Sequence, residues 1–193
     1  MLVLKVIRIT EDLARGALAL PLSVTDYINQ KRGDARTERA VGMLLLKQTL
    51  DELGVSSYGV ETLPSGKPIL MGAPYHFSIS HSGGLCALAL SDLPVGIDLQ
   101  SLSAFDLISS HSRFAERFLS PDERRAFLQE PTGDQLCRLW TRKEALVKLL
   151  GRTLSTSLSS LSSLSFDGIE FECRRAEIDG GIYFLTVARR KTL

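Results

Sequence analysis

The stretch that decides the fold is FSISHSGGLCALALSDLPVGIDLQ, residues 77–100. It contains three β-type runs, residues 77–82, 85–91 and 95–100, which are separated by Gly83-Gly84 and by Asp92-Leu93-Pro94. Short runs bounded by Gly and Pro turns predict strands, and Asp92-Leu93-Pro94 predicts a hairpin connection between the second and third runs. Because strand side chains alternate with period two, we expect Asp98 and Gln100 to share a face.

A buried strand and a long helix precede this stretch. Residues 2–9 are apolar on both faces, which is typical of a buried strand. Over residues 35–53 the apolar positions recur at helical spacing, and Gly54 follows where a C-terminal glycine cap belongs.

The second part of the chain carries helices and then a hairpin. Residues 113–118 read as helical, and Ser120-Pro121-Asp122-Glu123 predicts a capping box. A long helix is expected over residues 134–150, ended by Gly151, and Asp179-Gly180-Gly181 connects two alternating runs that predict a β-hairpin. The serine-rich residues 154–165 could form a flexible connection or a short amphipathic turn.

This order of elements predicts an α+β fold in which a similar unit occurs twice. The chain has 193 residues, enough for one domain or for two small halves that share a core. We place the halves at residues 1–94 and 95–193 and expect them in a pseudo-twofold arrangement.

Composition excludes several classes of protein. The net charge is +1, which offers no overall field for nucleic acid. The three cysteines are widely spaced without a CxxC pair, so we expect buried thiols in a reducing compartment. No apolar run approaches the roughly 20 residues of a membrane span, and Lys5 and Arg8 interrupt the N-terminal run, so we expect a cytoplasmic protein that binds neither membrane nor nucleic acid.

Three motifs could carry chemistry: SISHS at 78–82, VGIDLQ at 95–100 and WTRKEALVK at 140–148. Each also has a structural explanation. Asp98 could close a turn, and His81 shares a strand face with Phe77 and Ile79, which by pattern favours a core histidine. Glu144 and Lys148 have the spacing of a surface helix ion pair, worth about 0.2 to 0.5 kcal/mol.

Together, in this order, the motifs resemble the 4′-phosphopantetheinyl transferase superfamily, in its larger, pseudo-dimeric form of the surfactin-synthetase-activating type. The resemblance runs from Gly66-Lys67-Pro68 through the three motifs and RFLSPDE at 117–123 to Gly151. It implies an enzyme that transfers the 4′-phosphopantetheine arm of coenzyme A to a serine of an apo acyl or peptidyl carrier protein, with Mg²⁺, and releases adenosine 3′,5′-bisphosphate.

The resemblance also implies roles for individual residues. Asp98 and Glu144 would hold Mg²⁺, which prefers oxygen ligands, and Glu144 is also the expected base for the incoming serine. Lys148 would contact the transferred phosphate as a point charge. Further positions correspond to contacts with coenzyme A: Lys67, Ser80 and His81 with its phosphates, and Lys31, Arg32, Arg36 or Arg39 with its 3′-phosphate.

One position departs from the pattern of the family. A second acid normally follows the strand aspartate by two residues, and this chain has Gln100 there. An amide oxygen can still bind a cation or a metal-bound water, but the site loses one negative charge, so we expect weaker Mg²⁺ binding. A weakened homologue that binds coenzyme A or a carrier protein without efficient transfer is therefore the alternative.

The remaining expectations concern partners. Carrier proteins tend to be acidic near the modified serine, so a basic surface at Arg113, Arg117, Arg124 and Arg125 could receive one, although the pattern of these residues favours an ordinary solvated helix face. A repeated unit within one chain suggests a monomer, with coenzyme A between the halves. A serine hydrolase at Ser80-His81-Ser82 is disfavoured because no GxSxG elbow is present.

Overall fold

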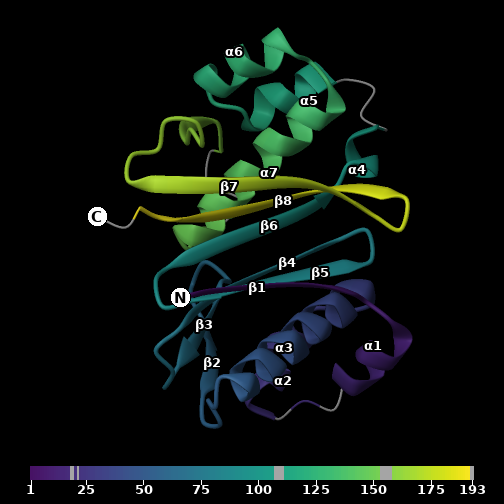
Figure 1. Ribbon diagram of the computed structural model, residues 1–193, viewed down its shortest axis with the longest axis vertical. Coiled ribbons are helices and arrows are strands. Elements are labelled where there is room, and N and C mark those ends of the chain that lie inside the picture. Colours follow the sequence, from purple (N-terminus) through teal and green to yellow (C-terminus); the bar gives the residue numbers. More distant parts are fainter. Residues whose placement is uncertain (18–19, 21, 107–110, 153–157, 192–193) are drawn as a thin grey trace.

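The computed structural model describes residues 1–17, 20, 22–106, 111–152 and 158–191 (Figure 1). The first part of the chain contains β1 (Leu2–Arg8), α1 (Glu11–Ala17), α2 (Leu22–Asn29), α3 (Asp34–Glu52), β2 (Gly59–Thr62), β3 (Pro68–Met71), β4 (His76–Ser82) and β5 (Leu85–Ser91). The second contains β6 (Val95–Ser101), α4 (Ser103–Asp106), α5 (His111–Phe118), α6 (Pro121–Gln129), α7 (Gly133–Leu149), the 3₁₀ turn η1 (Leu158–Ser160), β7 (Ile169–Ile178) and β8 (Gly181–Arg190).

The two parts repeat one topology. The first sheet has the order β1-β5-β4 and the second has the order β6-β8-β7. In each, a strand is followed by helices and then by a hairpin, and that first strand pairs antiparallel with the second strand of the hairpin. The predicted α+β fold is confirmed, and the boundary between residues 94 and 95 remains a proposal about how the chain divides.

The elements form four layers, helix, sheet, sheet and helix, which Figure 1 shows from bottom to top. Side chains alternate along β5, so Cys86, Leu88 and Leu90 lie on one face of the strand, where they pack in a core with α3. The opposite face of β5 meets the second sheet, where Leu85 and Ala87 share a cluster with residues of β6 and β8. Both faces of β5 are therefore buried, as its nearly continuous apolar sequence requires.

The long helices end as their sequences predict. At the end of α3 the N–H of Gly54, with φ of 74°, bonds the carbonyl of Asp51, and the N–H of Val55 bonds that of Leu50. Gly151, with φ of 64°, ends α7 with the same pair of bonds. This Schellman arrangement needs a left-handed residue, which explains both glycines. The capping box at Ser120 and Glu123 is also confirmed.

The predicted hairpin at Asp92-Leu93-Pro94 is wrong. Both edges of β5 are already paired, with β1 and β4, so β6 has no place beside it and joins β8 in the other sheet. Residues 92–94 carry the chain from one sheet to the other. The hairpin lies at Gly83-Gly84 instead, where positive φ values of 56° and 76° suit a tight turn between β4 and β5.

Other sequence expectations have mixed outcomes. Cys86 and Cys137 are buried as expected, whereas Cys173 is only half-buried. The open question of residues 154–165 is answered in part by the 3₁₀ turn η1, while residues 153–157 lie outside the described residues. Within the described ranges, no helix combines the length and apolar character that crossing a membrane requires.

Candidate functional site

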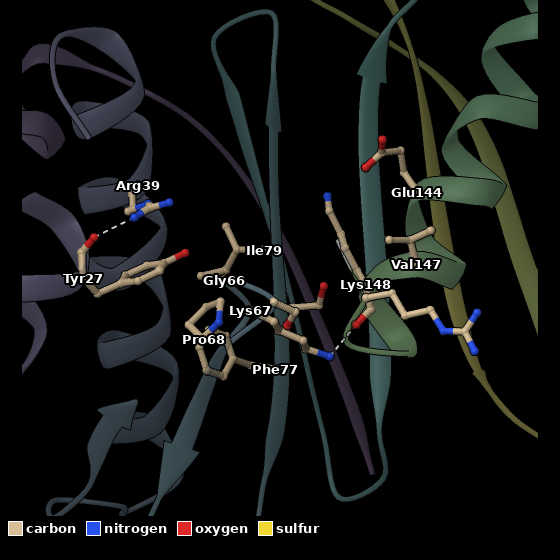
Figure 2. Close-up of a pocket in the computed structure, with 13 residues that line it drawn as sticks. Tyr27, Arg39, Gly66, Lys67, Pro68, Phe77, Ile79, Glu144, Val147 and Lys148 are labelled. Atoms are coloured by element: carbon tan, nitrogen blue, oxygen red, sulfur yellow. Dashed lines mark hydrogen bonds between the residues drawn. The ribbon is translucent and has the colours of Figure 1, made fainter. Parts of the chain in front are cut away.

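A cavity of about 380 Å³ lies between the two halves of the chain. Figure 2 shows Tyr27 and Arg39 on one side of it and Glu144 and Lys148, which extend from α7, on the other. The volume falls in the range of small-molecule sites. The described lining residues are Tyr27, Arg39, Ser65, Gly66, Lys67, Pro68, Phe77, Ser78, Ile79, Glu144, Val147, Lys148 and Arg152.

Helix α7 packs unusually close to β6 at this site. A Cβ atom on Gly96 would lie 2.0 Å from the carbonyl oxygen of Ala145 and 2.6 Å from the amide nitrogen of Leu149, so only glycine fits. Asp98 lies on the same face of β6 as Gly96, because the strand alternates. The close approach therefore brings Asp98 next to α7.

Asp98 is 4% exposed and is held through one carboxylate oxygen. Its Oδ1 accepts hydrogen bonds from Lys148 Nζ at 2.7 Å and from Ser80 Oγ at 2.8 Å. Lys148 also donates to Ser80 Oγ at 3.0 Å, which closes a triangle of three groups. Asp98 is not among the described lining residues, whereas Lys148, to which it bonds, lines the cavity.

Glu144 is 6% exposed and interacts electrostatically with Asp98 and Lys148. Burial and, to a smaller extent, the negative charge of Asp98 raise the pKa of Glu144 to about 7, with Lys148 opposing the shift. Glu144 Oε1 and Asp98 Oδ2 are both buried without a hydrogen-bond partner. Two unpartnered, hard oxygen acceptors are the donor set that Mg²⁺ takes from a protein, so the residues fit that ion.

The interpretation of Glu144 and Lys148 as a surface ion pair is wrong. Glu144 is buried, and the ammonium of Lys148 bonds to Asp98 on the neighbouring strand. The helical spacing places both side chains on the face of α7 that meets β6, and this face is covered rather than solvated.

Lys67 lines the cavity from the turn between β2 and β3. Its ammonium donates to the carbonyl of Lys148 at 2.5 Å, as Figure 2 shows, and to the carbonyl of Val95 at 3.5 Å. Burial and, to a smaller extent, the positive charge of Lys148 lower the pKa of Lys67 to about 8. Lys67 therefore ties the β2–β3 turn to the last turn of α7.

Ser80 and His81 are not lining residues of this cavity. The core interpretation of His81 is wrong, because its side chain is 40% exposed at the end of β4 and its Nδ1 lies 2.9 Å from Glu38 Oε2. Partial burial lowers the pKa of His81, with Glu38 opposing the shift. The predicted contacts of Ser80 and His81 with coenzyme A remain untested.

Of the four basic residues before and in α3, Arg39 lines the cavity. Its guanidinium stacks over the ring of Tyr27 at 4.1 Å, and its Nη1 donates to the Tyr27 carbonyl at 2.7 Å. Arg36 instead donates to Asn29, while Lys31 and Arg32 are exposed. The geometry therefore favours Arg39 over the other three as a cavity cation.

Gln100 is half-buried and shares the face of β6 with Asp98, as predicted. Among the described residues, no group of three or more His, Cys, Asp or Glu side chains is placed to hold a metal ion. An acid in place of Gln100 would supply such a third carboxylate on this face.

Several contributors were missed by sequence reasoning. Tyr27 gives no local signal, because its role depends on α2 lying beside α3. Lys143, in the WTRKEALVK motif, forms a fully buried ion pair with Glu123 at 2.5 Å. Three backbone carbonyls also accept from Lys143 Nζ, so this pair anchors α6 and η1 against α7.

Comparison with known proteins bears on the whole chain. The sequence model of the 4′-phosphopantetheinyl transferase superfamily matches residues 94–187. The chain is 38% identical over 143 residues to the 4′-phosphopantetheinyl transferase psf-1 of Bacillus pumilus, which covers 70% of this chain and 59% of that protein. It is 33% identical over 115 residues to the 4′-phosphopantetheinyl transferase Sfp of Bacillus subtilis (strain 168), covering 58% of this chain and 49% of that protein.

These matches span only about half to three-fifths of the Bacillus proteins. A longer match is the 4′-phosphopantetheinyl transferase AcpT of Escherichia coli (strain K12), 30% identical over 171 residues, which covers 81% of this chain and 80% of that protein. The resemblance of the motifs and these matches agree, and the chain belongs to the 4′-phosphopantetheinyl transferase superfamily.

Proposed function

We propose that this protein transfers the 4′-phosphopantetheine group of coenzyme A to a serine of an apo acyl or peptidyl carrier protein, and that it releases adenosine 3′,5′-bisphosphate. The observation that carries the proposal is the pair of buried, unpartnered carboxylate oxygens, Asp98 Oδ2 and Glu144 Oε1, near Lys148, where Glu144 and Lys148 line the cavity between the halves. Membership of the superfamily supports the same reaction.

Asp98 and Glu144 would hold Mg²⁺, with Gln100 as a further oxygen donor. When bound, the ion would neutralise charge on the diphosphate of coenzyme A. Glu144 would have a second role as the base for the carrier serine, because its carboxylate lines the cavity beside Lys148.

The cationic side chains around the cavity would bind different phosphate groups of coenzyme A. Lys148, once released from Asp98, would bind the transferred phosphate, and the ammonium of Lys67, which reaches the carbonyl of Lys148 from the β2–β3 turn, would lie beside it. Arg39, held by Tyr27 across the cavity, would take the 3′-phosphate end of coenzyme A. Ser80 and His81 would contribute only if the substrate reaches beyond the described lining.

A carrier would dock on the basic surface of α5 and α6. Arg117 and Arg125 are exposed there, and Arg124 donates to the carbonyl of Glu116. The side chain of Arg113 lies outside the described residues. Reversing charge at Arg117 and Arg125 should raise KM for the carrier while leaving KM for coenzyme A unchanged.

The test is a loading assay read by mass spectrometry against a panel of apo carriers from fatty-acid, polyketide and nonribosomal peptide synthesis. With coenzyme A and Mg²⁺, a carrier should gain the mass of one phosphopantetheine group. Asp98→Asn and Glu144→Gln, which are close to isosteric, should abolish the gain. Full activity in both variants would show that the cation assignment is wrong.

Gln100 supports a second candidate function, in which the protein binds coenzyme A or a carrier protein without efficient transfer. The loss of one negative charge beside Asp98 favours it. Calorimetry that shows tight binding of coenzyme A beside no loading of any carrier would select this alternative.

A further inference from the structure

The two sheets meet along β4 and β6 without sharing a backbone ladder. Each strand is an edge of its own sheet, and the two lie side by side (Figure 1). Serine hydroxyls of β4 bridge them: Ser78 Oγ accepts from the N–H of Ile97 at 3.1 Å, and Ser82 Oγ accepts from the N–H of Ser101 at 2.9 Å. Both bonds join residues 19 apart, so the strands run parallel in a fixed register.

These bonds satisfy groups that burial would otherwise leave unpaired. Ile97 is fully buried and Ser101 nearly so, and an edge-strand amide in such a position needs an acceptor. Alternation along β4 puts Ser78, Ser80 and Ser82 on one face, while Phe77 and Ile79 fill the core under α3. The middle hydroxyl, that of Ser80, bonds to Asp98 itself.

The join has a consequence for the cavity because its two walls belong to different halves. Asp98 and Glu144 come from β6 and α7, which pack against each other within the second half. Arg39 and Lys67 come from the first half. The separation of the two walls therefore depends on how β4 and β6 are fastened, together with the bonds of Lys67 to the carbonyls of Val95 and Lys148. The two serine bonds flank Asp98 on either side.

We propose that Ser78 and Ser82 are positioning residues that set the carboxylates of the second half at the right separation from the cationic wall of the first half. The inference rests on the proposed function, since it assigns the cavity to coenzyme A. The proposal predicts different effects on two ligands. A cation bound by Asp98 and Glu144 contacts only the second half, whereas coenzyme A, which spans the cavity, contacts both halves.

Ser82→Ala is the decisive variant, because Ser82 is not among the described lining residues and its Oγ bonds to β6. Calorimetry should show Kd for coenzyme A, in the presence of Mg²⁺, raised at least fivefold. Binding of Mn²⁺ without coenzyme A should stay within twofold of the parent protein. Ser82→Thr, which keeps the hydroxyl, should restore coenzyme A binding.

Ser91→Ala is the matched control. Ser91 is a buried serine of β5 whose Oγ accepts from the N–H of Leu93 at 3.1 Å and donates to the carbonyl of Met1 at 3.1 Å, so these bonds are not part of the β4–β6 join. It should lose a comparable amount of thermal stability without any change in Kd for coenzyme A. An equal rise in Kd for Ser91→Ala would show general loosening and overturn the proposal.

A second measurement needs no variant. In the parent protein, the amides of Ile97 and Ser101 should exchange with deuterium as slowly as those of the paired strands, and fast exchange would overturn the proposal. If the parent protein binds coenzyme A and Ser82→Ala binds it equally well, the positioning role of the serines is wrong, and the proposed function still stands. A parent that does not bind coenzyme A would overturn the proposed function together with it.

Discussion

Gln100 sets the charge of the candidate cation site. It lies on the face of β6 that carries Asp98, and an amide supplies an oxygen without a negative charge. Gln100→Glu should therefore lower the Mg²⁺ concentration that half-saturates transfer by several-fold, because a third carboxylate strengthens attraction for the ion. Gln48→Glu, which adds the same charge on an exposed position of α3, is the control. A half-saturation that does not fall would contradict the charge argument.

Glu144 gives the protein a pH dependence of known sign. Burial raises its pKa from an ordinary 4.5 to about 7. Below pH 4.5 the carboxyl is protonated in the folded and the unfolded states. Between pH 4.5 and 7 the carboxyl ionises mainly in the unfolded state, so stability falls as pH rises, by on the order of 3 kcal/mol in total.

Glu144→Gln removes this titration. Without metal, the variant should melt at a higher temperature than the parent protein at pH 8 and at nearly the same temperature at pH 4.5. Melting curves at both pH values check the prediction. A difference of equal size at the two pH values would assign the effect to packing rather than to charge.

Lys148 occupies the place of a counterion to Asp98. Its ammonium must leave Asp98 Oδ1 for a divalent ion to be bound without repulsion. Lys148→Met should therefore bind Mn²⁺ in the absence of coenzyme A about tenfold more tightly, or about 1.4 kcal/mol, while transfer is lost. Lys67→Met removes a lysine of the same cavity whose ammonium bonds to the backbone carbonyls of Val95 and Lys148. This variant should gain much less Mn²⁺ affinity. Equal gains in both variants would contradict a specific role of the Lys148–Asp98 pair.

At the scale of elements, α7 is the part that builds the site, and its contact with β6 depends on Gly96. Gly96→Ala would place a methyl group 2.0 Å from the Ala145 carbonyl, so α7 would have to move away. We expect a loss of about 2 to 3 kcal/mol in the free energy of unfolding, together with weaker Mn²⁺ binding as Glu144 moves away from Asp98. Gly59→Ala, where the nearest atom is 3.8 Å away, should cost much less in urea unfolding. Comparable losses would contradict the close-packing argument.

Elements whose signals are local could be predicted from the sequence. The helices α3 and α7 and their glycine ends depend on apolar spacing and on a left-handed residue, both of which are visible within about 20 positions. The partner of β6 could not be predicted, because the pairing of β5 with β1 involves strands almost the whole first half apart. A short connection such as residues 92–94 looks the same whether it turns back or crosses to another sheet.

At the scale of the whole molecule, the same limit applies to the candidate site. The resemblance to the family implied cation and phosphate roles for the residues at 98, 144 and 148, and in the structure Lys148 bonds to Asp98 while both charges act on the pKa of Glu144. What the pattern could not give is which groups meet: the Lys148–Asp98 bond, the stack of Arg39 on Tyr27 and the exposure of His81 follow from packing of distant segments. The charge state and the burial of each site residue depend on neighbours that lie far away in the sequence.

The cavity draws one wall from each half of a single chain, which predicts that a monomer is sufficient for activity. If the walls came from two copies, a variant defective in the first half could complement one defective in the second. We expect no complementation when Arg39→Ala/Lys67→Met is mixed with Glu144→Gln, and light scattering should give the mass of one chain. Restored transfer in the mixture would show that the working site is shared between chains, since each variant then supplies the wall that the other lacks.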